Sequence, residues 1–265
     1  MRPELSIEYS DALESAFRDL RGTDALVQPE VDFSSSEYQA LLARFKVYQK
    51  QDLRPQPLPP LRLYTCYRGV PFDSPVEVVS VDEEFVELRV TRRQAKVLAG
   101  RGFAMVESPI HGTAFRAFTS DVDEQACCAS FSHFVPHYDL SDLRTHMRVE
   151  PRVSIPVTLS RETVTITGHL SDMSELAMAI RFREIGATGL TEGMATNIAI
   201  TLPLVTGDCA VQTTGIIAKV APNVFGSFSE QRVIVQMSPD PSVKEVFIQY
   251  IAQRQEEVYA ELGSE

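Results

Sequence analysis

Short apolar stretches that alternate with polar residues fill two regions of the chain, residues 61–134 and 153–237. Successive side chains of a β-strand point to opposite faces, so this two-residue period predicts strands with one buried face. We expect six strands in each region, at residues 61–68, 76–81, 84–90, 102–107, 113–120 and 126–132, then at 153–159, 164–171, 178–182, 196–203, 210–220 and 233–237. With one short helical insert at 91–98, this pattern predicts a mainly β fold of two small antiparallel barrels.

Glycine, proline and polar residues mark the turns that we expect between these strands. Residues 69–73 are predicted to join the first two strands, and residues 221–223 to join the last two. The pairs Glu192–Gly193 and Thr206–Gly207 are typical of tight turns, because glycine adopts the backbone angles that such turns need.

A helical period replaces the strand pattern near both ends of the chain. We expect helices at residues 5–21, from Ser34–Ser36 to Tyr48, and from Pro241 or Ser242 to Leu262. The second has N-cap candidates and five apolar residues at helical spacing, Tyr38, Leu41, Leu42, Phe45 and Tyr48. It is interpreted as a packing helix or a partner-binding helix. The last helix places its charged residues, Arg254 among them, on a polar face.

These elements divide the chain into three parts. Residues 1–60 form a helical region that ends in a proline-rich spacer, since four of the residues 54–60 are proline. Residues 61–140 form the first barrel, and residues 141–265 form the second barrel together with the long C-terminal helix.

Composition and charge narrow the class of protein. The net charge of −11 argues against a protein that coats nucleic acid. The apolar runs are shorter than the roughly 20 residues of a membrane-spanning helix, and acidic residues at positions 8, 11 and 14 argue against a signal peptide. The four cysteines form no CxxC pair, so they are interpreted as reduced, buried residues of a cytoplasmic protein. His133 and His137 flank a proline, which disfavours a helical metal pair.

Two polar clusters carry the candidate chemistry. Arg144, Arg148 and Arg152 lie four residues apart just before the second barrel, and Asp172 precedes Ser174 by two positions, about twenty residues later. Guanidinium groups bind phosphate with two parallel hydrogen bonds and stack on flat rings. A carboxylate accepts hydrogen bonds from the N1 and N2 donors of guanine. The set thus suits a guanine-containing phosphate ligand. Alternatively, the arginines are solvated or paired with carboxylates such as Glu150, and Asp-x-Ser begins a turn.

The order of these residues resembles the PilZ domain, a bacterial receptor module for cyclic di-GMP. Its pattern is RxxxR, a strand, then [D/N]xSxxG, and the resemblance covers residues 141–262. Arg144 and Arg148 match the first part, and Arg148 and Arg152 give an overlapping match. The second part matches from Asp172, except that Ala177 stands where the family has glycine.

The resemblance implies roles for these residues. The arginines would bind the phosphates and the Hoogsteen edges of the guanines, Asp172 would pair with the donor edge of guanine, and Ser174 would support it. Alanine at position 177 is harmless if the backbone there is ordinary β, and strained if it is left-handed. The final strand and helix also resemble flagellar-brake proteins of the YcgR type, in which a degenerate split barrel precedes the PilZ barrel.

The leading hypothesis is a cytoplasmic cyclic di-GMP effector with neither a catalytic function nor a cofactor. Ligand binding would change the arrangement of its two barrels, which a protein partner in the flagellar motor, the pilus or the exopolysaccharide and biofilm machinery would then read. The second hypothesis is a degenerate PilZ adaptor that binds only protein. An enzyme is disfavoured, because the sequence contains no HExxH, GxSxG or Walker-type motif.

Overall fold

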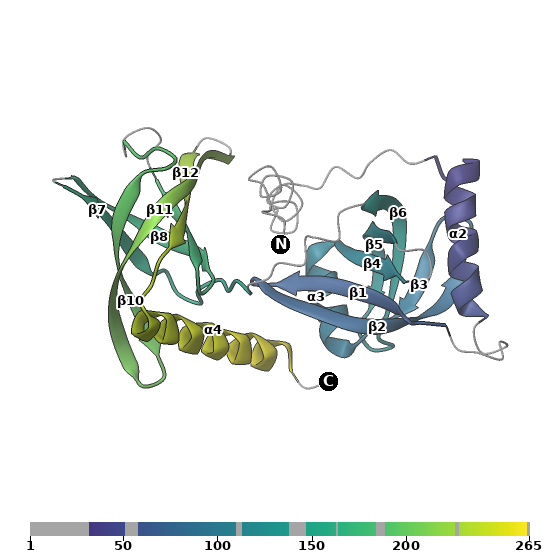
Figure 1. The fold of residues 1–265 in the computed structure, drawn as a ribbon. Coiled ribbons are helices and arrows are strands. Elements are labelled where there is room, and N and C mark those ends of the chain that lie inside the picture. Colours follow the sequence, from purple (N-terminus) through teal and green to yellow (C-terminus); the bar gives the residue numbers. More distant parts are fainter. Residues whose placement is uncertain are drawn as a thin grey trace, which may run out of the picture. The chain divides into compact units, whose positions relative to one another are not determined.

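The structure, a computed structural model, describes residues 32–50, 58–109, 113–137, 147–162, 164–183, 189–225 and 228–263. Two closed barrels of six antiparallel strands each make up most of it, as the sequence predicted (Figure 1). Among the described residues, one unit comprises 32–67, 71–137 and 262–263, and the other comprises 68–70 and 147–261. The helix predicted at residues 5–21 lies outside the described residues, as does Arg144.

The first barrel has the strand order β1-β2-β3-β6-β5-β4. Its strands are β1 (Leu61–Tyr67), β2 (Val70–Val81), β3 (Val86–Arg89), β4 (Phe103–Ser108), β5 (Thr113–Asp123) and β6 (Cys128–His137). The turn predicted at residues 69–73 is wrong, because β2 already begins at Val70 and buries Val70 and Phe72. Only Arg68 and Gly69 form the turn, with positive φ angles of 50° and 81°. A two-residue turn of this kind fits the twist of a hairpin.

Helices α2 (Ser36–Gln49) and α3 (Arg92–Arg101) complete the first unit. In α2, the side chain of Ser35 accepts a hydrogen bond from the Tyr38 amide, which caps the helix. All five predicted apolar residues of α2 are buried in the core that the barrel strands also form. The interpretation as a packing helix is therefore confirmed. Helix α3 is longer than the predicted insert and begins with a capping box between Thr91 and Gln94.

The second barrel has the strand order β10-β11-β12-β9-β8-β7. Its strands are β7 (Pro156–Arg161), β8 (Val164–Met173), β9 (Ala177–Phe182), β10 (Ala195–Leu204), β11 (Gly207–Phe225) and β12 (Phe228–Met237). The turn at Glu192–Gly193 is confirmed, with φ 80° at Gly193. The other predicted tight turn lies one residue earlier, at Val205 and Thr206, because Gly207 already pairs with Leu204.

The turn predicted at residues 221–223 is wrong, because these residues continue β11 and pair with β12. Strand β10 pairs with β11 only as far as Ile216, so Pro222 lies where β11 has a single strand neighbour. A proline, which lacks an amide hydrogen, is tolerated at such an edge. Proline and asparagine therefore do not end the strand here.

Helix α4 (Pro241–Leu262) begins where the sequence predicted. The Asp240 carboxylate accepts a hydrogen bond from the Val243 amide at 2.9 Å, and this bond lowers the pKa of Asp240. One side chain differs from the prediction, since Arg254 is 1% exposed instead of facing solvent. The helical spacing explains this result, because Tyr250, Arg254 and Val258 lie four residues apart on the buried face.

Two further observations concern the whole described chain. All four cysteines are reduced thiols and only half-buried, so the interpretation of these residues as buried is wrong. Cys66 and Cys209 lie within β1 and β11, Cys128 is the first residue of β6, and Cys127 lies in the preceding turn with a positive φ of 53°. Within the described ranges, every helix is too short or too polar to cross a membrane.

Candidate functional site

Asp172 lies at the end of β8, and its side chain is completely buried. A β-bulge between Leu170 and Asp172 shifts the register, so that Asp172 lies opposite Ala179 of β9. Bulges redirect side chains in this way. Ala179 alternates with the buried Ile180 and shares a face with the exposed Arg181. Asp172 therefore belongs to the outer face of the barrel, although it is shielded from solvent.

Ser174 lies just beyond β8 and forms the turn into β9, so Asp172 and Ser174 do not share one strand. The Ser174 amide donates to the Ala177 carbonyl at 2.7 Å, and the Ser174 hydroxyl accepts from the Ala177 amide at 3.1 Å. The hydroxyl also lies 3.3 Å from the Ala177 carbonyl, to which it donates. The interpretation of Asp-x-Ser as the start of a turn is confirmed. Ser174 holds the turn that follows Asp172.

Two arginines contact the buried carboxylate of Asp172. Nη2 of Arg232 donates a hydrogen bond to Oδ2 at 3.1 Å, and Nη1 of Arg148 lies 3.5 Å from Oδ1. The arginine side chains retain 16% and 19% of their exposure, whereas Asp172 retains none. Val149 forms a two-way backbone bridge with Met173, at 2.9 and 3.0 Å, and so fixes the main chain beside Arg148. The result is a shielded acceptor between two cationic donors.

The predicted arginines do not all gather at Asp172. Arg148 reaches it, whereas Arg152 is exposed and lies near α4. Burial tends to raise the pKa of Glu257 in α4, but hydrogen bonds from Gln253 and Arg254 and the charges of Arg254 and Arg152 lower it overall. Arg148 belongs to both matches to the RxxxR pattern, and it is the one of these arginines that contacts the Asp172 carboxylate in the described part of the chain.

Sequence reasoning missed Arg232, which lies in β12, sixty residues after Asp172. Strand pairing places Arg232 opposite Arg181 of β9, and Arg181 opposite His169 of β8. Residues directly opposite each other share one face of a sheet. His169, Arg181 and Arg232 thus form a basic row beside Asp172. In the sequence, these three residues stand out only as polar residues among the apolar residues of their strands.

Position 177 has the ordinary β backbone, which is the first of the two conformations that the sequence analysis considered. Ala177 is the first residue of β9 and pairs with Gln236, and among the described residues other than glycine only Arg68, Cys127, His133 and Glu162 have positive φ. Alanine fits an extended backbone without strain. The departure from the family pattern therefore leaves the geometry of this turn unstrained.

We expect Ala177→Gly to lower stability by about 0.5–1 kcal/mol, because glycine loses more chain entropy in a strand, and to change any affinity for cyclic di-GMP by no more than about twofold. Titration calorimetry with cyclic di-GMP and thermal unfolding measure the two effects. A gain in affinity of tenfold or more would show that the missing glycine does limit the site.

The described residues contain no group of three or more histidine, cysteine or acidic side chains placed to hold a metal ion. His133 instead pairs through Nδ1 with the hydroxyl of Ser132 at 2.8 Å. The side chain of His137 lies outside the described part of the chain.

Comparisons with known proteins give similarities among solved structures. No family model matches the chain, and no curated protein matches it. The Bacillus subtilis inhibitor of motility MotI/DgrA is 12% identical, with a TM-score of 0.39, covering 76% of this chain and 99% of its own. Escherichia coli YcgR in complex with c-di-GMP is 14% identical, with a TM-score of 0.38. The match covers 84% of this chain and 92% of the YcgR chain.

The PilZ domain of Escherichia coli YcgR, solved with c-di-GMP, is 16% identical, with a TM-score of 0.38, and covers 45% of this chain and 96% of that domain. The chain is thus similar to structures of PilZ proteins, the family that its motifs resemble.

Proposed function

We propose that this chain is a cyclic di-GMP-binding effector. The observation that carries the proposal is the buried carboxylate of Asp172, placed between the guanidinium groups of Arg148 and Arg232 on the outer face of a barrel. A buried carboxylate with two cationic neighbours offers one strong acceptor and several donors in a small space. The sequence from Arg144 to Ser174 resembles the pattern that PilZ domains use for this ligand.

Each part of the site has a chemical role in the proposal. Asp172 accepts from the N1 and N2 donors of guanine, which replace or join its arginine contacts. Arg148, Arg152 and Arg144 bind the phosphates and the Hoogsteen edges of the bases. Arg181 and Arg232 extend this cationic surface over two further strands, and His169 continues the row on a third. Ser174 and Ala177 keep the adjoining turn in place.

The arginines precede the second barrel and follow the first barrel in sequence. Ligand binding at these arginines changes the constraint on the joint between the barrels. A protein partner in the motility, pilus, exopolysaccharide or biofilm machinery then reads the change. In this proposal the protein is a cytoplasmic regulator and catalyses no reaction.

A second candidate function is a protein-binding adaptor without nucleotide. The observation that favours it is the pairing of Asp172 with arginines of its own chain and of Ser174 with its own turn. Both residues then serve the fold alone.

Titration calorimetry distinguishes the two functions. We expect cyclic di-GMP to bind the intact chain, and Arg148→Ala to weaken binding by about 10- to 100-fold, because a hydrogen bond to a charged group contributes about 1.5–3 kcal/mol. Arg161→Ala is the matched control, since Arg161 is an exposed arginine at the end of β7. No heat with the wild-type chain would favour the adaptor, and affinity capture from cells that lack the nucleotide would then test for a protein partner.

A further inference from the structure

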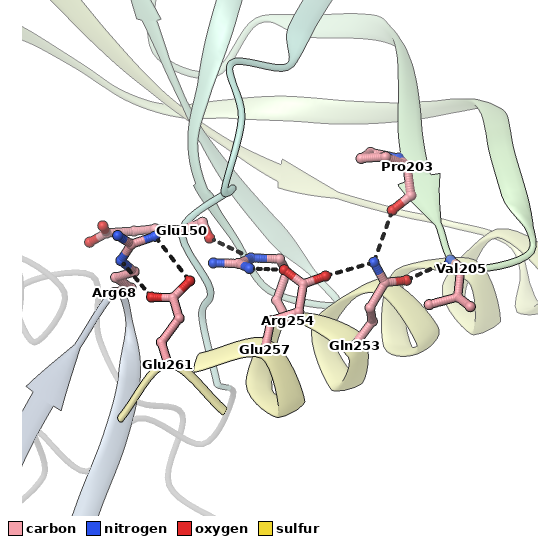
Figure 2. A network of polar contacts seen from close by, with 8 residues as sticks. All are labelled: Arg68, Glu150, Pro203, Val205, Gln253, Arg254, Glu257 and Glu261. Carbon is pink, nitrogen blue, oxygen red and sulfur yellow. Dashed lines mark hydrogen bonds and ion pairs between the residues drawn. The ribbon is translucent and has the colours of Figure 1, made fainter. Parts of the chain in front are cut away.

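Arg254 is the largest fully buried side chain in the part of the chain that the structure describes. It projects from α4 toward the segment that carries the candidate ligand-binding arginines, and Figure 2 shows its surroundings. Taking a charged group out of water costs several kcal/mol, and well-packed apolar residues often stabilise a fold as well as a buried ion pair does. Stability alone is therefore a weak explanation for an arginine at this position.

The contacts of Arg254 are directional. Its Nε donates to the backbone carbonyl of Glu150 at 3.1 Å, and its Nη1 forms an ion pair with the carboxylate of Glu257 one turn further along α4. Gln253 holds the same carboxylate by donating a hydrogen bond at 3.0 Å. Gln253 also accepts from the Val205 amide at 2.9 Å, at the turn between β10 and β11. The guanidinium group is thus oriented by Glu257, which is itself held in place.

Glu150 is the residue at the centre of the interval from Arg148 to Arg152. Both of its backbone groups are occupied, because its amide donates to the carbonyl of Arg68 at 3.0 Å and its carbonyl accepts from Arg254. Arg68 in turn forms an ion pair with Glu261 near the end of α4, with 3.4 Å between Nε and Oε2 (Figure 2). Helix α4 therefore holds the centre of this segment directly and through Arg68.

We infer that Arg254 is a positioning residue for the nucleotide site. It fixes the carbonyl of Glu150, and with it the directions in which Arg148 and Arg152 leave the main chain. The fork of an arginine suits this task, because it bonds a carbonyl and a carboxylate at fixed angles, whereas the ammonium of lysine is a point charge on a flexible stem. This inference rests on the proposed function for its consequence in ligand binding, but its structural part concerns the ligand-free chain.

The test uses the full-length chain with Arg254→Met, which keeps a long apolar side chain. Without ligand, we expect amide exchange of peptides covering residues 147–152 to be about tenfold faster, because one of the two bonds to Glu150 is lost. Affinity for cyclic di-GMP should fall about tenfold, since the loosened Arg148 and Arg152 must then be ordered when the ligand binds. Arg161→Met is the control and should change neither quantity.

A second variant covers the case in which Arg254→Met does not fold. Glu257 is 28% exposed, so Glu257→Gln keeps the packing and only loosens the orientation of Arg254. We expect changes in the same direction, of about threefold, because a neutral partner roughly halves the strength of the bond.

Three outcomes decide the matter. Faster exchange with weaker binding supports the inference. A folded variant with a lower melting temperature, but with wild-type exchange at 147–152 and wild-type affinity, shows a merely structural arginine and overturns it. Faster exchange in the variant, with no binding by the wild-type chain, refutes the proposed function and leaves the positioning role standing.

Discussion

Replacing Asp172 with alanine is expected to destabilise the second barrel by about 2–3 kcal/mol and to weaken cyclic di-GMP binding by at least about 100-fold. Removing the carboxylate leaves Arg148 and Arg232 facing each other with little solvent to screen them, since their side chains are only 19% and 16% exposed. The same change removes the only acidic group that the proposal assigns to guanine. Urea unfolding followed by peptide-resolved hydrogen exchange separates the second barrel from the first.

Asp208→Ala is the matched control for this substitution. Asp208 is an exposed aspartate in β11 of the same barrel, so its removal should change stability by less than about 0.5 kcal/mol. Asp172→Asn adds a second comparison, because the amide keeps the shape of the side chain but loses its charge. A stable Asp172→Ala variant that still binds the nucleotide would contradict both the role of the carboxylate and the proposed site.

The barrels were predictable because strand alternation is a local signal that residues such as Ile198, Ile200 and Leu202 carry in every second position. The ends of the strands were less predictable, because proline and glycine can either form a turn or lie within a strand at the edge of a sheet. Pro222 lies in β11 because only one strand pairs with it there, which no local pattern records. Residues 70–73 are strand because the turn needs only Arg68 and Gly69.

The candidate site was partly predictable for a similar reason. Asp172, Ser174 and Arg148 belong to a pattern of fixed spacing, so the sequence alone points to them. Arg232 reaches Asp172 only through the pairing of β9 with β12, and Arg254 reaches Glu150 only through the packing of α4. A charged residue on an amphipathic helix is ordinarily assigned to solvent, and that rule misplaced Arg254.

The second large effect is expected for Gly69→Ala, at the turn between β1 and β2. A Cβ at this position would lie 2.5 Å from the carbonyl oxygen of Arg148 and 3.2 Å from the Cα of Val149, and φ is +81°. Both contacts are with backbone, so the arginine segment or the turn must move. We expect a loss of about 3 kcal/mol, of which about 1 is backbone strain and the rest is overpacking. Urea unfolding measures this loss.

Gly193→Ala separates the two contributions, because Gly193 has φ +80° but a Cβ there would enter open space, with no heavy atom within 4 Å beyond its chain neighbours. It should lose only the strain, about 1 kcal/mol, and keep wild-type affinity for cyclic di-GMP. Gly69→Ala should in addition bind the nucleotide more weakly, since displacement of the Arg148 carbonyl moves the guanidinium that pairs with Asp172. Equal losses of stability in the two variants, with equal affinities, would mean that the turn does not restrain Arg148. A larger loss of stability in Gly69→Ala than in Gly193→Ala, with equal affinities for cyclic di-GMP, would mean that the turn stabilises the fold at Arg148 but does not affect ligand binding.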